Sequence, residues 1–412
     1  MKNFDLVIGG AGAAGLIASI HAAELGMSVL VIEKMSVPGK KLLITGKGRC
    51  NITNDAEIKD FLNEVYPDGR FLYPAFRSFF SSEMLDLLSE CGVETMLERG
   101  GRYFPVSEKA SDVVDALYKR AVQYGVEFIF DSIITRVKYE NESVVGAECK
   151  QNHKTILIST NKLIVCTGGK SYPGTGSTGD GYKIAKDAGH TIQKTFPSLV
   201  PLVTKNQQAI QMQGLALKNI NASLYIDNQH IVSEFGDLLF THFGLSGPVI
   251  LTISRNVVLA LEENRKVEIL IDFKPALDND KLDKRLLRDI NEFGKKKIGN
   301  LFRQWLPQKA IQVFIDELKI DAEKPANQIS GSERESIVQL MKSFRFEIEN
   351  HRGFKEAIVT AGGVSINEIN PKTMESKIKS GLCFAGEILD LDANTGGYNL
   401  QIAFSTGWLA AN

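Results

Sequence analysis

A glycine-rich turn near the start of the chain constrains its fold more than any other feature. The turn, GGAGAAG at residues 9–15, follows a short apolar run at Phe4 to Ile8 and leads into a helical stretch that reaches Leu25. A second apolar run, Ser28 to Ile32, comes next. Strand, glycine turn, helix and strand in this order form the context in which GxGxxG binds dinucleotides. The pattern predicts an α/β fold with a Rossmann-like parallel sheet.

Each glycine of the motif has its own expected role. Gly10 permits the tight turn, Gly12 lets a pyrophosphate approach the backbone, and Gly15 allows the helix to pack closely on the strand. The free N–H groups and partial positive charge of the helix N-terminus favour phosphates at this place. Glu33, 21 residues after Gly12, can accept hydrogen bonds from both hydroxyls of an adenosine ribose. A ribose without a phosphate indicates FAD or NAD.

The loop after Glu33 favours FAD over NAD. Residues 38–54, PGKKLLITGKGRCNITN, are rich in glycine and lysine but lack the GxxxxGK[ST] spacing of a Walker A loop. Basic residues and exposed backbone directly after the ribose-binding strand suit a long ligand that continues across the sheet edge. A solvated basic loop is the alternative interpretation.

The end of the chain is expected to return to the nucleotide-binding part. Leu382 to Glu387 is typical of a strand ending in Gly-Glu, and NTGGYN at residues 394–399 leads into an apolar helix from Leu400 to Ala411. Two glycines before a helix N-terminus make a second anion site. That site suits the N1/C2 carbonyl edge of a flavin, where negative charge collects on reduction.

Composition limits the class of protein and its partners. A chain of 412 residues is too long for one ordinary hydrophobic core, so two or three domains are expected. Lys and Arg number 48 against 49 Asp and Glu, which leaves a formal charge of -1 and no basic field of the kind that a general nucleic-acid binder carries. We therefore expect a small-molecule substrate and no nucleic-acid partner, with the oligomeric state open.

The cysteines and the N-terminal stretch bear on localisation. Five cysteines lie far apart without CxxC spacing, which argues against disulfides and a structural zinc site, so no metal is expected, and fits a reducing cytoplasm. The uncharged stretch from Leu6 to Ala23 holds four glycines and follows Asp5, unlike a signal peptide or a membrane span. We expect a cytoplasmic protein without membrane attachment.

Several longer segments point to a known family. They are GGAGAAGL, GKKLLITGKGRCNITN, GRYFPVSEKASDVV, SYPGTGSTGDGY, LFTHFGLSGP, VTAGGV, INPKTMESK and FAGEILDLDANTGGYNLQIAF, and they extend from residue 5 to about 408. Together they resemble the signatures of the bacterial three-domain, BaiN-type NAD(P)/FAD-dependent oxidoreductases. The resemblance implies a non-covalent FAD and a cofactor domain that is interrupted by a β-rich domain and a small helical domain.

The resemblance also implies which residues contact the cofactor. The family's FAD contacts would fall on Gly10, Gly12, Gly15, Glu33, Lys40, Gly48, Arg49, Asn51, Gly168, Gly386, Glu387, Gly397, Tyr398 and Asn399. Neighbouring positions of the same segments complete the candidate set, namely Ala13, Ala14, Lys34, Lys41, Cys50, Thr167, Gly169 and Gly396. The sequence departs from the family at Lys40, where arginine is common, and at Lys47, inside what is often a run of three glycines. Lysine supplies charge but not a fork-shaped pair of donors.

A second GxGxxG, GTGSTG at residues 174–179, is not interpreted as a separate NAD(P)H domain. A loop separates it from the preceding strand, and the next candidate strand carries no acid. We expect Gly179-Asp180-Gly181, which opens a helix to Ala188, to help hold FAD. NAD(P)H is left open as a transient substrate.

The remaining pattern divides the chain. Residues 1–195 and 355–412 are predicted to form the FAD-binding domain, with strands between Glu127 and Cys166. Residues 196–275 and 345–354 form a β-rich, barrel-like substrate domain with short strands (LVPLVT, LYI, LLF and EILIDF), and residues 276–344 form a helical domain. Ser332 to Glu335 is interpreted as a capping box for the helix that ends near Phe344.

A flavin carries its own reactivity, so the protein has only to position a substrate over N5 and supply polar partners. The candidate catalytic residues are His242, Arg102 and Tyr398. His242 can donate a proton near neutral pH or can simply be a structural histidine. Cys50 is interpreted as a packing residue rather than a redox thiol, because no second cysteine lies near it.

The first functional hypothesis is an FAD-dependent oxidoreductase that transfers hydride between a small organic substrate and flavin N5. The alternative is an FAD-binding sensor or structural flavoprotein without fast turnover. A flavin-dependent enzyme that modifies nucleic acid is a third hypothesis, which the near-zero charge disfavours and which salt-dependent RNA binding would support.

Overall fold

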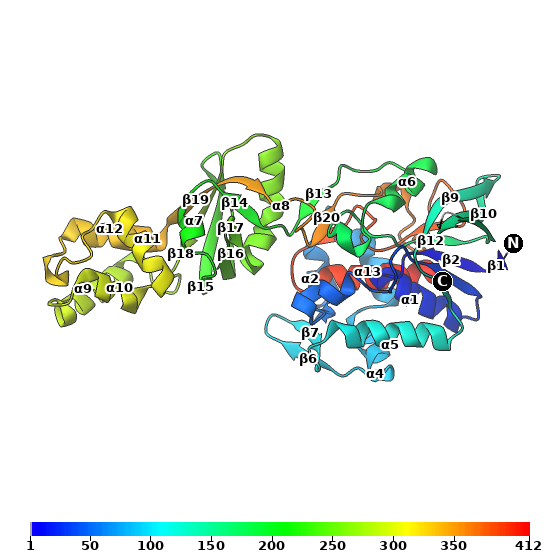
Figure 1. Ribbon diagram of the computed structural model, residues 1–412, viewed down its shortest axis with the longest axis horizontal. Helices are drawn as coiled ribbons and strands as arrows, with labels where there is room; N and C mark the ends of the chain where they lie inside the picture. Colours follow the sequence, from blue (N-terminus) through cyan, green and yellow to red (C-terminus); the bar gives the residue numbers. More distant parts are fainter. Residues whose placement is uncertain (1, 153) are drawn as a thin grey trace. The chain divides into compact units, whose positions relative to one another are not determined.

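The computed structural model describes residues 2–152 and 154–412, and the chain divides into two compact units (Figure 1). The first unit consists of residues 1–197 and 357–412. The second unit, residues 198–356, is an insertion between these two parts in the sequence.

A five-stranded parallel sheet forms the centre of the first unit. Its strand order is β21-β12-β2-β3-β8, so the last strand of the sheet in the sequence lies at one edge beside β12. The bounds are β2 (Leu6–Gly9), β3 (Val29–Ile32), β8 (Glu127–Ile129), β12 (Leu163–Val165) and β21 (Leu382–Phe384). Strands β2, β3, β12 and β21 are buried along their whole length, as expected of a parallel sheet covered on both faces. The predicted Rossmann-like α/β fold is confirmed.

The first strand begins later than predicted. Phe4 lies before β2. The Asp5 carboxylate accepts hydrogen bonds from the backbone N–H and the hydroxyl of Ser28, at 2.8 and 2.6 Å, and these bonds mark a break between two strands. Upstream of this break, β1 (Lys2–Asn3) joins a different sheet, with the order β1-β11-β10-β9. Its other strands are β9 (Ser132–Glu140), β10 (Ser143–Gln151) and β11 (Lys154–Ser159).

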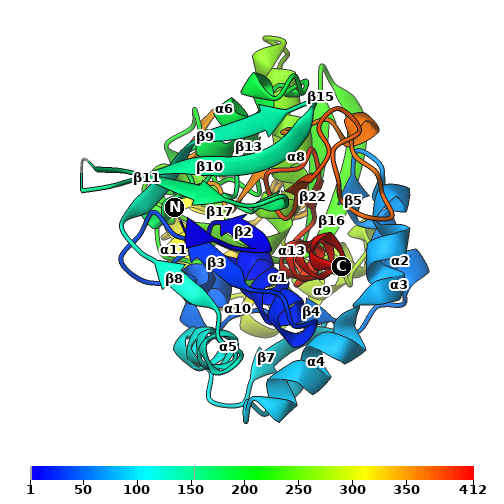
Figure 2. The ribbon, with the colours of Figure 1, turned by 90° about the vertical axis from the view of Figure 1, so that its right-hand side faces the viewer.

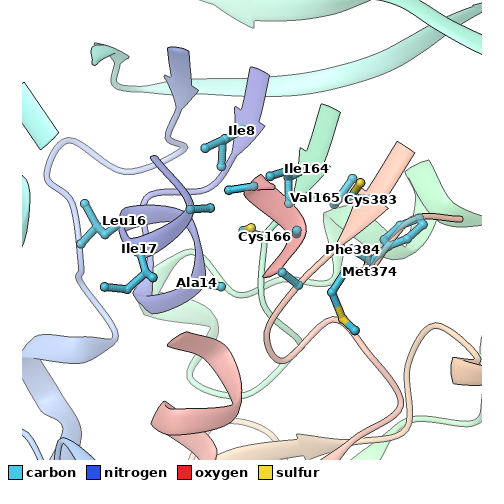
Figure 3. Packing of buried hydrophobic residues seen from close by; sticks show 14 of the residues in the cluster. Ile8, Ala14, Leu16, Ile17, Ile164, Val165, Cys166, Met374, Cys383 and Phe384 are labelled. Carbon is cyan, nitrogen blue, oxygen red and sulfur yellow. The ribbon is translucent and has the colours of Figure 1, made fainter. Parts of the chain in front are cut away.

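Two apolar helices from opposite ends of the chain pack together against the parallel sheet. Helices α1 (Ala13–Glu24) and α13 (Tyr398–Ala411) lie side by side (Figure 2), and a Cβ on Gly407 would lie only 2.3 Å from the carbonyl oxygen of Ala14. Glycine at this position therefore sets how closely the helices approach. One buried core cluster contains residues of α1, β2, β12 and β21, among them Leu16, Ile8, Ile164 and Phe384 (Figure 3).

The rest of the first unit consists of short elements around this core. The helices are α2 (Ile58–Asn63), α3 (Tyr73–Ser78), α4 (Ser81–Glu90), α5 (Ala110–Gln123) and α6 (Asp180–Asp187). The strands are β4 (Thr53–Asn54), β5 (Val65–Tyr66), β6 (Thr95–Glu98), β7 (Arg102–Pro105), β13 (Phe196–Ser198), β20 (Val359–Ala361) and β22 (Asp392–Ala393). Strands β4, β7 and β6 form a small antiparallel sheet.

The second unit contains a closed six-stranded barrel with the order β14-β17-β16-β15-β18-β19. Its strands are β14 (Leu202–Thr204), β15 (Ala216–Ile226), β16 (Gln229–Phe240), β17 (Gly244–Ser246), β18 (Val267–Asp272) and β19 (Phe344–His351). In β15 the buried Ile220, Ala222, Leu224 and Ile226 alternate with less buried polar residues, the period that a barrel wall requires. The barrel-like domain is thus confirmed, with two strands much longer than predicted.

Helices of the second unit accompany the barrel. They are α7 (Gln208–Gln211), α8 (Pro248–Glu262), α9 (Asn279–Phe293), α10 (Ile298–Trp305), α11 (Gln308–Leu318) and α12 (Gly331–Lys342). The predicted capping box was wrong by two residues. Ser330 Oγ accepts the N–H of Glu333, and the Glu333 carboxylate accepts the N–H of Ser330, so the box spans Ser330 to Glu333. Phe344 begins β19 instead of ending the helix.

Within the described parts of the chain, every helix is too short or too polar to cross a lipid bilayer.

Candidate functional site

The glycine turn between β2 and α1 gives its three motif glycines different surroundings. Gly10 has a φ of +103°, and a Cβ there would lie 2.5 Å from the carbonyl oxygen of Cys166. A Cβ on Gly15 would lie 1.9 Å from the carbonyl oxygen of Gly10, so the helix packs directly on the turn. At Gly12, the N-cap of α1, a Cβ would meet no atom of the described residues within 4 Å. The helix N-terminus is therefore open at the one glycine that is expected to face phosphate.

Glu33 directly follows β3, beside this turn, and is buried. Its Oε2 accepts the N–H of Ala11 at 2.6 Å, and its Oε1 accepts the N–H of Met35 at 2.7 Å. Burial raises the pKa of the carboxyl group, and the backbone N–H donors oppose this shift. Each carboxylate oxygen can accept a second hydrogen bond, so Glu33 can hold the turn and still accept from ribose hydroxyls.

The second glycine loop lies against the end of β3. A Cβ on Gly176 would lie 3.0 Å from the Met35 side chain and 4.0 Å from Glu33 Oε1. Lys34 Nζ donates to Thr178 Oγ1 at 2.6 Å and to Asp180 Oδ2 at 2.7 Å, at the start of α6. Lys34 thus ties this loop to the sheet. The loop borders the expected ribose position, in line with a role in holding FAD.

Lys41 and Glu387 come together although 346 residues separate them. Lys41 Nζ lies 2.6 Å from Glu387 Oε2 and 2.6 Å from Ser171 Oγ. Glu387 Oε1 accepts the Ser171 hydroxyl at 2.7 Å. The backbone around this cluster approaches closely, because a Cβ on Gly169 would lie 2.8 Å from Glu387 Oε1.

The segment after β12 runs under the same turn. Gly168 has a φ of +71°, a left-handed conformation that favours glycine. Thr167 Oγ1 is buried without a hydrogen-bond partner among the described residues, and a Cβ on Gly181 of α6 would lie 2.1 Å from it. Across the turn, a Cβ on Gly386 would lie 3.1 Å from Ala14 Cβ, so the Gly-Glu segment borders the first turn of α1.

The loop from residue 38 to residue 54 places its candidates in unequal surroundings. Arg49 forms ion pairs with Glu98 and Glu108 and stacks 4.2 Å above the Phe104 ring. Asn51 Oδ1 is buried and has no hydrogen-bond partner within the described part of the chain. Lys40 and Gly48 are partly exposed.

Cys50 is fully buried, and burial raises the pKa of its thiol to about 12. All five cysteines are free. A thiol with this pKa is not a thiolate at neutral pH, which supports its interpretation as a packing residue.

The C-terminal turn lies against the end of this loop. A Cβ on Gly397, which has a φ of +100°, would lie 2.4 Å from the carbonyl oxygen of Thr53. Asn54 Nδ2 donates to the carbonyl oxygen of Gly396 at 2.9 Å. The Asn399 side-chain amide accepts the N–H of Ala393 at 2.9 Å and donates to its C=O at 2.7 Å, and so holds together the two ends of the turn at residues 394–398.

The three catalytic candidates lie in different places. Tyr398 is the first residue of α13, its ring packs edge-on against Phe61, and burial raises the pKa of its hydroxyl. Arg102 lies in β7 opposite Asn54, and its Nε donates to the carbonyl oxygen of Arg99 at 3.0 Å. His242 belongs to the second unit, where it is exposed and lies edge-on to Phe243. Tyr398 and Arg102 both lie beside β4, whereas His242 belongs to a separate body.

Sequence reasoning missed the polar partners of its own candidates. Lys34 donates to Thr178 and Asp180, Lys41 donates to Ser171, and Glu387 accepts the N–H of Thr360. These four partners lie outside the sequence segments that carry the candidates. The SYPGTGSTGDGY segment, which contains three of them, was the available signal.

A buried polar triad also escaped notice. The Ser376 hydroxyl lies 2.7 Å from His190 Nε2, and His190 Nδ1 lies 3.1 Å from Glu368 Oε2. The order matches a hydrolase triad, but the His190 side chain is 0% exposed and Ser376 Oγ also accepts the N–H groups of Ile378 and Lys379. These three residues therefore brace a loop. Within the described residues, no group of three or more His, Cys, Asp or Glu side chains is arranged to hold a metal ion.

The residues around the glycine turn fit a dinucleotide. The open space at Gly12, a helix N-terminus without an acidic residue in its first turn and a carboxylate with spare acceptor capacity are the groups that a diphosphate and a ribose require. The close approach of the Gly386 and Gly168 segments to this turn provides the backbone surface for a longer ligand.

Comparisons with known proteins agree with this geometry. A family model described as the HI0933-like protein Rossmann domain matches residues 4–412. The chain is 30% identical to the 3-dehydro-bile acid delta(4,6)-reductase of Clostridium scindens over 98% of its length and 97% of the relative. It is also 30% identical to the ribosomal RNA dihydrouridine synthase of Escherichia coli, over 100% of its length and 98% of the relative.

Solved structures show the same fold at lower identity. The 3-ketosteroid delta1-dehydrogenase of Sterolibacterium denitrificans superposes with a TM-score of 0.55 at 12% identity, covering 100% of this chain and 99% of the other. A quinol-fumarate reductase superposes with a TM-score of 0.54 at 16% identity, covering 100% and 70%.

Proposed function

The chain belongs to the family of HI0933-like proteins with a Rossmann domain and is an FAD-dependent oxidoreductase, for which we propose hydride transfer between flavin N5 and a carbon–carbon double bond conjugated to a carbonyl group. The observation that carries the cofactor assignment is the open helix N-terminus at Gly12 beside the Glu33 carboxylate. The proposed reaction class rests on the full-length relatives.

The relatives share one kind of chemistry. A 3-dehydro bile acid with double bonds at positions 4 and 6 is a conjugated ketone, and a delta(4,6)-reductase saturates such bonds. Dihydrouridine forms when the ring double bond of uridine, which is conjugated to a carbonyl, is saturated. In the reaction that we propose for this chain, a hydride adds to the carbon distal to the carbonyl and a proton adds to the carbon next to it. When bound, reduced FAD would supply the hydride.

The chain's own residues have defined tasks in this proposal. The N-terminus of α1 binds the diphosphate, with Gly12 allowing close approach, and Glu33 accepts the ribose hydroxyls. The turn at Gly396 and Gly397 leads into the N-terminus of α13, whose free N–H groups would stabilise negative charge on a flavin bound beside them. Tyr398 is a candidate proton donor, because a tyrosine hydroxyl is protonated at neutral pH; burial raises its pKa further. His242 and Arg102 remain candidates for proton transfer and for binding a substrate anion.

A second candidate substrate is uridine in ribosomal RNA. Two relatives with this activity, from Escherichia coli and from Haemophilus influenzae at 31% identity over 98% of the chain, favour it. The expectation of no nucleic-acid partner, which rested on net charge, therefore stays a prediction to be tested. A cytoplasmic location likewise stays a prediction.

Anaerobic reduction of the purified protein tests the proposal. NADH and NADPH are added separately while the visible absorption of the flavin is followed. Rapid bleaching by one of them, followed by return of the absorption on addition of cyclohexenone, is the expected result for a reductase of conjugated ketones. Return only with ribosomal RNA transcribed in vitro, together with a mass gain of two hydrogens on uridine, supports the second candidate.

Two other outcomes contradict the proposal. Bleaching by dithionite alone indicates an enzyme that takes electrons from an amine or alcohol substrate. A flavin that no donor or acceptor turns over supports a sensor or structural flavoprotein.

A further inference from the structure

A largely buried ion pair lies beside the N-terminal end of α1. The side chains of Lys41 and Glu387 are only 22% and 18% exposed, and their charged atoms lie 2.6 Å apart. The second hydrogen bond of Lys41 Nζ is to Ser171 Oγ, also at 2.6 Å. Two of the three N–H groups of this lysine are therefore directed at protein oxygens.

The carboxylate of the pair is held from three sides. Besides Lys41, Glu387 accepts the Ser171 hydroxyl at 2.7 Å and the backbone N–H of Thr360 at 3.1 Å. Thr360 Oγ1 in turn accepts the N–H groups of Lys170 and Ser171, at 2.8 and 3.0 Å. Four separate segments of the first unit meet at this one carboxylate.

Backbone contacts place these segments against the glycine turn. The N–H of Gly39 donates to the carbonyl oxygen of Ala11 at 2.8 Å, two residues before Lys41. Gly386, directly before Glu387, packs against Ala14 in the first turn of α1. The ion pair thus borders the helix N-terminus at which the proposed function places a diphosphate.

An anionic side chain at this position opposes the binding of a diphosphate unless its charge is compensated. We infer that Lys41 acts as a positioning residue through Glu387, neutralising a carboxylate that joins four loop segments around the cofactor. In this arrangement Glu387 organises the loops, Lys41 cancels its charge, and the N–H groups of α1 meet the phosphates. The inference rests on the proposed binding of FAD.

Opposite charge changes test this inference. Apoproteins of K41M, E387Q and the double variant are titrated with FAD at low ionic strength, and the Kd is measured by quenching of flavin fluorescence. K41M leaves an uncompensated carboxylate and should weaken FAD binding by about tenfold or more, whereas E387Q leaves a cation and should hold or tighten it. The double variant should recover to within about threefold of the wild type.

A purely structural network gives a different result, since both single variants would then weaken FAD binding and the double variant would be worse still. That outcome overturns the inference. K41R keeps the charge and is expected to bind FAD like the wild type. A loss of FAD affinity in K41R as large as that expected of K41M would also contradict the inference. K41R therefore provides a test even if K41M is not recovered as a folded protein. Absence of FAD binding by the wild type is distinguishable, because it refutes the proposed function itself.

Discussion

Gly12 and Gly15 lie three residues apart in one turn, yet a Cβ would meet open space at the first and a backbone carbonyl at the second. The motif alone predicts that glycines are needed at both positions. The structure distinguishes a position that is open to a ligand from a position that is closed by packing. The distinction leads to opposite expectations for the same substitution.

G12A should leave the fold intact and weaken FAD binding. Gly12 has a φ of -82°, which alanine adopts without strain, but its Cβ would project into the open space where we propose that the diphosphate binds. Loss of one charge-assisted hydrogen bond costs roughly 1.5–3 kcal/mol, so the Kd should rise about tenfold or more. The matched variant G15A should instead lower the free energy of unfolding of the apoprotein by about 3 kcal/mol through overpacking. Equal effects of the two variants on apoprotein stability would contradict these assignments.

Thiol reactivity offers a second test at this scale. Burial raises the pKa of all five thiols, but Cys91 is partly exposed whereas Cys50, Cys149, Cys166 and Cys383 are buried. We expect iodoacetamide at pH 8 to label Cys91 first in the native protein and all five cysteines after unfolding, as read by peptide mass spectrometry. Rapid labelling of Cys50 in the native protein would support a redox thiol instead.

Side-chain partners mark the limit of prediction at the residue scale. The backbone requirements of Gly10, Gly12 and Gly15 follow from local geometry, so a motif reveals them. The partners of Lys41 lie 130 and 346 residues away, and only the assembled sheet brings them together. Two of the three lysines that the sequence assigned to the cofactor, Lys34 and Lys41, donate to side-chain oxygens of such distant segments.

At the scale of elements, local pattern located the helices but not all of their ends. Leu282, Leu286 and Ile290 recur at helical spacing and form the buried face of α9. The start of α12 was misplaced because two Ser-x-x-Glu sequences overlap at residues 330–335, and only one of them forms the reciprocal hydrogen bonds. Strands β15 and β16 are longer than the apolar runs within them, because the polar residues beyond these runs still pair across the ladder.

The α12 cap can be tested by a pair of serine variants. S330A removes the oxygen that accepts the N–H of Glu333, and should lower the free energy of unfolding of the protein by about 1 kcal/mol. S332A, two residues away, should have a much smaller effect. Urea unfolding of both variants provides the measurement. A larger decrease in the free energy of unfolding with S332A would indicate instead that the capping box spans Ser332 to Glu335.

At the scale of the whole molecule, the order of the elements along the chain was predictable from the sequence, but the packing of the two ends of the chain against each other was not. The strand–turn–helix start and the glycine-rich end of the chain indicate one nucleotide-binding domain that is resumed after an insertion. The packing of α13 on α1, which depends on Gly407, links the two ends through contacts that no local pattern reveals.

Buried histidines give the molecule an expected dependence on pH. Burial lowers the pKa of His190, His21 and His351 below the ordinary 6.5, and His190 faces Glu368 and Ser376 in the folded chain. The unfolded chain therefore binds more protons below pH 6.5, and stability should fall as the pH falls through this range. Urea unfolding at pH 7.5, 6.5 and 5.5 should show this loss, with a shallower slope for H190Q. Stability that is constant or rises towards pH 5.5 would contradict the expectation.

The central claim is that the turn between β2 and α1 binds one non-covalent FAD. The most direct measurement is the flavin content of the purified protein. The protein is denatured by heat, and the flavin released into the supernatant is identified by its absorption and mass. We expect one FAD per chain in the supernatant and none left on the denatured protein, and we expect G12A to carry much less. Protein without flavin that also fails to bind added FAD, or a flavin that stays attached to the chain, would contradict the claim.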